Sequence, residues 1–106
     1  MAFSTAQDLQ SFLKTNTGLR AVFVESWEGA VQPPYIVVGE METDTVAADN
    51  TVYAKEKRYF IDLFTKKTDN ETSAIVEEAL ADNDIFFANE TYWLEDLRLV
   101  CHEYEI

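Results

Sequence analysis

The chain has 106 residues, of which 47% are hydrophobic, and this composition argues against disorder and for one folded domain spanning residues 1–106. Twenty acidic residues against eight basic ones give a net charge of −12. Because so few cations are present, binding to nucleic-acid phosphates or to an anionic membrane is not expected. The negative charge serves either solubility or complementarity to a basic partner surface.

The beginning of the chain lacks the basic and apolar segments of a signal peptide. No apolar run approaches the roughly 20 residues of a membrane span. Cys101 is the single cysteine, so no disulfide within the chain is possible. These features predict a protein of a reducing cytoplasm.

The first predicted element is a helix over residues 5–15. Leu9 and Leu13 recur at helical spacing, and Ser4 is a suitable N-cap with Gln7 three residues later, as in a capping box. Gly18 is placed to end the helix in a left-handed conformation.

Three strands are expected next, over residues 21–26, 35–43 and 52–65. Residues 27–32 and 45–51 are expected to be loops, and Pro33 and Pro34 precede the second strand. In the third strand, alternation predicts one face with Tyr59, Ile61 and Leu63. The other face then carries Arg58, Phe60, Asp62 and Phe64.

A second helix is predicted from a one-sided apolar pattern, capped by Asp69 or Asn70 and terminated by residues 82–84. Its predicted buried face comprises Thr72, Ile75, Val76, Ala79 and Leu80. Two further strands are expected over residues 86–94 and 97–104, with Glu95 and Asp96 forming the turn between them.

The predicted order is α-β-β-β-α-β-β. It indicates an α+β fold, with a mainly antiparallel sheet of about five strands and two helices packed on one face. Two helices cover at most one face, so some aromatic side chains are expected to stay partly exposed on the other face or at an edge, where partners bind. These aromatic residues are Phe60, Phe64, Tyr92 and Trp93.

No residue pattern predicts chemistry. Cys101 and His102 are adjacent, and neighbours on a strand point to opposite faces, so they are not expected to share a metal or form a nucleophile pair. The short acidic clusters match no calcium loop, and the three glycines are isolated. We therefore expect no catalytic residue, no metal ligand and no cofactor, and a protein that is not an enzyme.

Five of the eight basic residues are close in sequence, namely Lys55, Lys57, Arg58, Lys66 and Lys67. They either protect a strand edge or form a basic patch that meets the acidic surface of another copy in a head-to-tail ring. In the second case, reversing Lys55 and Lys57 to Glu is expected to reduce the oligomer mass. The candidate protein interface comprises Thr43, Asp44, Asp49, Asn50, Tyr53, Lys55, Lys57 and Arg58.

Several stretches between residues 34 and 106 carry a family resemblance. They are PYIVVGE at residues 34–40, ADNTVY at 48–53, KRYFIDLFTK at 57–66, IFF at 85–87 and YEI at 104–106. With these stretches the chain resembles the tail completion proteins, that is tail terminators and head–tail joining proteins, of long-tailed phages and prophages of Gram-positive bacteria.

The resemblance implies a structural protein of virion assembly that forms a ring, expected to be a hexamer. Its partners would be copies of itself, the tail tube protein and the head connector proteins. It would be located in the host cytoplasm during assembly, and then at the head–tail junction or tail end of the virion. Residues 43–51 would order on contact with neighbours.

Two other functions compete with this expectation. One is an acidic monomeric binding module that occupies a basic surface of a host or phage protein, which the net charge of −12 favours. The other is a small enzyme, which would need a carboxylate pair in a deep pocket.

Overall fold

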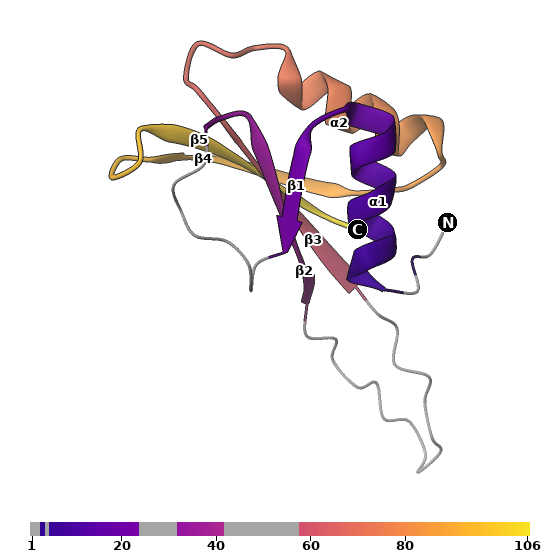
Figure 1. Ribbon diagram of the computed structural model, residues 1–106. Helices are drawn as coiled ribbons and strands as arrows, with labels where there is room; N and C mark the ends of the chain where they lie inside the picture. Colours follow the sequence, from indigo (N-terminus) through magenta and orange to yellow (C-terminus); the bar gives the residue numbers. More distant parts are fainter. Residues whose placement is uncertain (1–2, 4, 24–31, 42–57) are drawn as a thin grey trace.

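The computed structural model describes residues 3, 5–23, 32–41 and 58–106. It has the predicted α+β fold, with the elements in the predicted order (Figure 1). The elements are α1 (Ala6–Thr17), β1 (Arg20–Phe23), β2 (Tyr35–Met41), β3 (Arg58–Thr65), α2 (Thr72–Asp82), β4 (Ala88–Leu94) and β5 (Leu99–Glu105).

Helix α1 begins one residue later than the predicted cap implies. The N-cap is Thr5 and not Ser4, because the Thr5 hydroxyl oxygen accepts a 3.1 Å hydrogen bond from the Asp8 N–H. The helix also runs two residues beyond the predicted end. Gly18 then ends it at φ 71°, with its N–H donating to the Lys14 carbonyl, as predicted.

The five strands form one sheet in the order β1-β2-β3-β5-β4. The two predicted hairpins, β2 with β3 and β4 with β5, are antiparallel, as is the pair β3 and β5. Among the strands that the structure describes, only β1 runs parallel to its neighbour, β2. The sheet is therefore mainly antiparallel, as expected, with β1 and β4 as its two edge strands.

Some predicted strand bounds are wrong. β4 begins at Ala88 and not at residue 86, since the preceding residues belong to the connection from α2. β5 begins at Leu99, because the turn before it spans residues 95–98 and includes Arg98 at φ 52°. The predicted strand residues 24–26, 42–43 and 52–57 lie outside the described residues.

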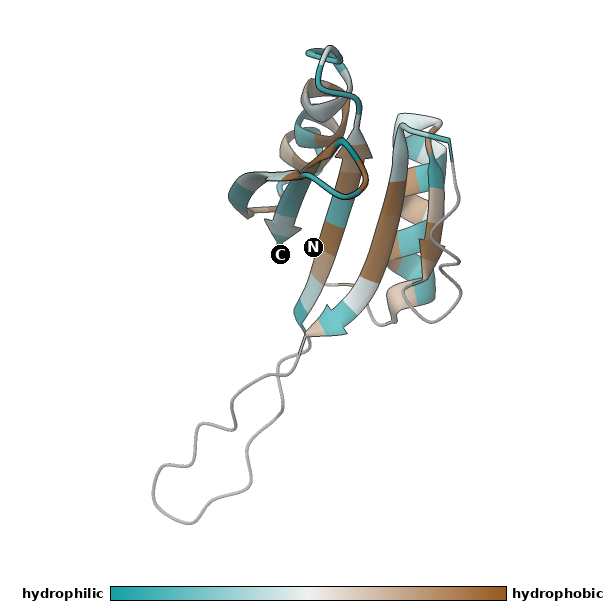
Figure 2. Ribbon diagram, turned by 90° about the vertical axis from the view of Figure 1, so that its left-hand side faces the viewer, coloured by the Kyte–Doolittle hydropathy of each residue, from teal (hydrophilic) through white to brown (hydrophobic). Residues whose placement is uncertain are grey.

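Both helices pack on the same face of the sheet. Leu9 and Leu13 of α1 and Val76 and Leu80 of α2 are fully buried against apolar side chains of the strands. Each such side chain stabilises the fold by about 1.5–3 kcal/mol. The strand residues of this main core are Ala21, Ile36, Val38, Tyr59, Ile61, Leu63 and Tyr104. Figure 2 shows hydrophobic residues along most of β2 and β3, in the middle of the sheet.

The helix-free face of the sheet has a buried cluster of its own. Tyr35 and Phe64 stack at 4.9 Å between ring centroids, and Val37, Leu99 and Cys101 complete the cluster. Phe64 is 4% exposed, so the expectation that it remains exposed is wrong. Phe60 is half-buried, and the two β4 aromatic side chains discussed below are exposed as expected.

Helix α2 buries a narrower stripe than predicted. Ile75 is 42% exposed, although it was expected on the buried face. At about 100° per residue, Ile75 lies about 85° from the centre of the stripe formed by Thr72, Val76, Ala79 and Leu80. The helix contacts the sheet along that stripe, so Ile75 is left at its margin.

Candidate functional site

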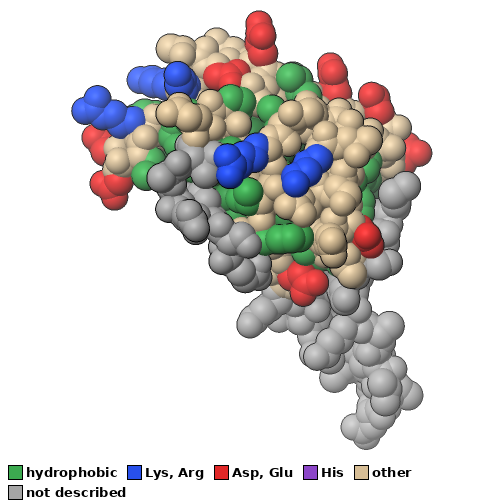
Figure 3. Space-filling model, viewed as in Figure 1, with side chains coloured by type: hydrophobic (Ala, Val, Ile, Leu, Met, Phe, Trp, Pro, Cys, Tyr) green, Lys and Arg blue, Asp and Glu red, His purple; other side chains and the backbone are tan. Residues whose placement is uncertain are grey.

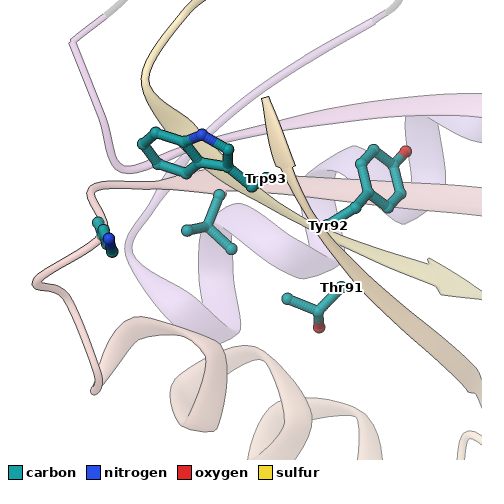
Figure 4. A pocket seen from close by; sticks show the side chains of 5 residues that line it. Thr91, Tyr92 and Trp93 are labelled. Carbon is teal, nitrogen blue, oxygen red and sulfur yellow. The ribbon is translucent and has the colours of Figure 1, made fainter. Parts of the chain in front are cut away.

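The β4–β5 hairpin extends past the two helices (Figure 1), and a shallow hollow lies beside it. β4 is an edge strand whose first six residues are all exposed. The hollow has a volume of about 360 Å³, and its lining residues are Lys67, Thr91, Tyr92, Trp93 and Val100. It lies between β4 and the connection from β3 to α2, as Figure 4 shows.

Strand alternation and one basic side chain shape this hollow. Thr91 and Trp93 point to the helix-bearing side, while Tyr92 points to the other. Trp93 is directly opposite Val100 and is 44% exposed. The Lys67 ammonium lies 5.8 Å from the centre of the Trp93 ring, at cation–π distance. The hollow thus combines an aromatic wall with a positive charge.

His102 lies near the hollow on the same side of the sheet. Its ring nitrogens are 3.2 Å from the Thr65 hydroxyl oxygen and 3.5 Å from the Thr91 hydroxyl oxygen. Burial lowers the pKa of the imidazole below its ordinary value. Cys101 belongs to the buried cluster on the opposite face, so the two residues point apart, as the sequence predicted.

Three carboxylates stand in a row on the helix-free face. The register places Asp62 of β3 opposite Glu103 of β5, and Glu103 opposite Glu90 of β4. Burial, together with the negative charge of Glu103, raises the pKa of Asp62 to about 7. One Asp62 oxygen, Oδ1, is buried without a hydrogen-bond partner. Like charges placed directly opposite each other destabilise a sheet.

Cys101 lies next to this row and is shielded from solvent. The side chain is 1% exposed, and burial raises the pKa of the thiol to about 11. A thiol with so high a pKa stays protonated at neutral pH, and the thiolate is the reactive form. The Tyr92 hydroxyl donates a 3.2 Å hydrogen bond to the Glu103 carboxylate, which anchors the tyrosine ring.

A second exposed feature lies at the other end of β4, where the chain leaves α2. The Asp84 N–H donates to the Ala81 carbonyl and the Ile85 N–H donates to the Leu80 carbonyl, with Asp84 at φ 57°. This is a Schellman motif, in which Ile85 also packs into the main core with Leu80. The sharp turn leaves the next residue, Phe86, 93% exposed.

We call residues 82–86 the acidic tip, since Asp82 and Asp84 precede its exposed phenylalanine, Phe86. The tip is well anchored on both sides. Ile85 is buried before Phe86, and Phe87 makes an edge-to-face contact with Tyr104 after it, at 5.3 Å between ring centroids. The position of Phe86 in the solvent is therefore fixed by its neighbours.

The candidate interface predicted from the sequence falls mostly on residues that the structure does not describe. Thr43, Asp44, Asp49, Asn50, Tyr53, Lys55 and Lys57 lie outside the described residues. Arg58 is exposed at the start of β3, opposite Met41.

The basic cluster expected from the sequence is not one cluster in space. Arg58 and Lys66 lie at opposite ends of the eight-residue strand β3, more than about 20 Å apart. Instead, five of the six basic residues in the described part lie at the end of the sheet where β1 and β2 begin and β3 ends. They are Lys14, Arg20, Lys66, Lys67 and Arg98. In Figure 3, Lys and Arg side chains lie at the upper left and in the centre, and acidic side chains lie along the periphery.

Within the described residues, no group of three or more His, Cys, Asp or Glu side chains is arranged to hold a metal ion. None of the described helices combines the length and apolar character needed to cross a membrane. No known protein family and no curated protein matches the sequence.

Proposed function

We propose that the chain is a structural protein of virion assembly, a ring-forming tail terminator or head–tail joining component. In this role it caps the tail tube and docks to the head connector. The proposal rests on the resemblance described above. The observation that carries it in the structure is that exposed hydrophobic side chains stand at both ends of a rigid, well-packed sheet, with Phe86 at one end and Tyr92, Trp93 and Leu97 at the other. Exposed apolar groups of this kind mark protein interfaces.

The mechanism of such a protein is geometric. The main core holds both helices against the sheet, so the two ends of the sheet keep a fixed separation and orientation. A contact between two different patches of identical chains closes into a ring when the rotation between neighbours permits it. The subunit then contributes shape and binding surface, and its partners are further copies, the tail tube protein and the head connector.

The direct test is to inactivate the gene in the phage or prophage that encodes it. Electron microscopy of the induced particles is expected to show filled heads and tails that are not joined, or tails with abnormal ends. Supplying the intact gene in trans is the control and should restore joined particles. Normal numbers of joined, infectious particles without the protein would refute the proposal.

A second candidate function is an acidic module that binds a basic protein surface. Glu103 and Glu90 on the helix-free face favour it, because adjacent carboxylates on one face attract lysine and arginine side chains. This function predicts a salt-sensitive one-to-one complex with a basic protein and no self-association. Sedimentation of the purified chain at several concentrations separates the two functions.

A further inference from the structure

The acidic tip and the hollow lie at opposite ends of the same strand. Phe86 precedes the first residue of β4 by two positions, while the hollow is built around Thr91, Tyr92 and Trp93 near its other end. Helix α2 ends at the tip, and the β4–β5 hairpin extends in the other direction (Figure 1). The two features of one chain therefore face away from each other and are not placed to contact each other.

The tip carries an apolar ring beside negative charges, and the hollow has an apolar wall beside a positive charge. The tip presents a 93% exposed phenylalanine ring that follows two aspartates, Asp82 and Asp84. The hollow of about 360 Å³ is walled by an aromatic ring and a valine and carries the Lys67 ammonium. Lys66 and Arg98 add positive charge around it, and Glu95 and Asp96 of the turn offset part of that charge.

We propose that the acidic tip of one copy of this chain inserts into the hollow of the next copy. Phe86 would pack against Trp93 and Val100 of the neighbouring copy, and the carboxylates of the tip would lie near the Lys67 ammonium of that copy. Aromatic pairs at offset or edge-to-face geometry contribute beyond the area that they bury. The contact is heterologous, since it joins two different patches, and so it generates a ring or a filament and not a twofold dimer.

This inference rests on the proposed function only for the closure of the ring, and it can be tested one contact at a time. In a Phe86→Ser variant the hollow is intact and the tip is disabled. In a Trp93→Ala variant the tip is intact and the hollow is disabled. A mixture of the two variants forms one tip-to-hollow contact per pair and cannot extend further.

The measurement is an NMR titration of ¹⁵N-labelled Phe86→Ser protein with unlabelled Trp93→Ala protein. We expect saturable shifts of the Trp93 indole N–H and of the Thr91 and Val100 amides. The matched control is an unlabelled Phe86→Ser/Trp93→Ala double variant, which has no tip and should cause none of these shifts. If the Trp93→Ala variant does not fold, a Lys67→Glu variant replaces it as the unlabelled protein, because its tip is intact and its hollow has lost the positive charge.

In the wild type, replacement of Phe86 by Ser should weaken self-association about tenfold or more, because a phenylalanine ring is no longer buried. Ile75→Ser is the matched surface control and should leave self-association unchanged, since Ile75 is exposed on α2 and contributes to neither feature. Absence of shifts in the mixture, or equal shifts with the double variant, would overturn the inference. If the wild-type protein forms rings and the Phe86→Ser variant forms the same rings, the inference is overturned and the proposed function is retained.

Discussion

At the scale of single residues, Asp69 stabilises the start of α2. Its carboxylate accepts hydrogen bonds from the Glu71 and Thr72 N–H groups at 3.0 and 3.1 Å, and also from the Thr72 hydroxyl. The hydrogen bonds from Thr72 are the largest cause of the lowering of the Asp69 pKa below its ordinary value. Asp69→Ala should therefore lower the free energy of unfolding by about 1 kcal/mol near pH 7.

A lowered pKa in the folded state means that the stabilisation by Asp69 is present above the unfolded pKa. It is lost as the pH falls through the folded value. Urea unfolding of wild type and Asp69→Ala should thus differ near pH 7 and converge in strong acid. Asn70→Ala, at the exposed neighbouring position, is the control and should show no difference at either pH. A pH-independent difference for Asp69→Ala would contradict this explanation.

Asp62 has the opposite effect on stability. Its pKa is raised to about 7 by burial and by Glu103, so the folded state holds a proton that the unfolded state releases. Stability is then greatest below the unfolded pKa and is lost as the pH rises toward the folded value.

Asp62→Asn should consequently raise the free energy of unfolding by about 1 kcal/mol near pH 8, after allowance for solvent screening of the carboxylate. Near pH 3 the gain should vanish, because the carboxyl group of the unfolded chain, with an ordinary pKa of about 3.9, is then also largely protonated. Urea unfolding at both pH values measures the difference. Glu90→Gln, at the exposed end of the same row, serves as the control and should change stability little. A loss of stability in Asp62→Asn near pH 8 would mean that the charged form is needed.

At the scale of elements, α2 gives two of its apolar side chains different environments. Leu80 is fully buried, whereas Ile75 is 42% exposed. Leu80→Ala should lower the free energy of unfolding by about 2–5 kcal/mol because it leaves a cavity in the main core. Ile75→Ala should cost less than about 1 kcal/mol. Chemical denaturation of both variants measures the contrast, and equal losses would show that Ile75 is packed more tightly than its exposure indicates.

The elements themselves were largely predictable, because periodicity and cap residues are local signals. Helical spacing located Leu9 and Leu13 and the core stripe of α2, and Gly18 marked the end of α1. The side chains whose exposure was predicted wrongly are those whose burial depends on tertiary contacts. Ile75 has the helical spacing of the buried residues of α2 but is exposed, and Phe64 alternates with the other residues of its strand face but is buried. The sequence pattern does not distinguish these cases, because the exposure of each side chain is set by how the elements pack together.

At the scale of the whole molecule, the candidate site was mostly not predictable. The hollow brings together Lys67 and Val100. The basic residues at the end of the sheet where β1 and β2 begin include Lys14 and Arg20 from the N-terminal elements. The hollow and this group of basic residues therefore both depend on the strand order and register. Sequence proximity instead grouped Arg58 with Lys66, which the sheet places far apart. The exposure of Phe86 could have been anticipated only from Asp84 in a left-handed conformation, for which the sequence gives a weak signal.

We expect copies of this chain to associate with one another through unlike patches and to form a closed ring. Native mass spectrometry of the purified wild-type protein can detect this ring, over a range of concentrations and at moderate salt that screens the charge of −12 per chain. We expect one discrete assembly of 12.1 kDa subunits, of a size consistent with a hexamer, in equilibrium with the single chain. A single chain at every concentration and salt, or an equilibrium that stops at a twofold dimer, would contradict ring formation.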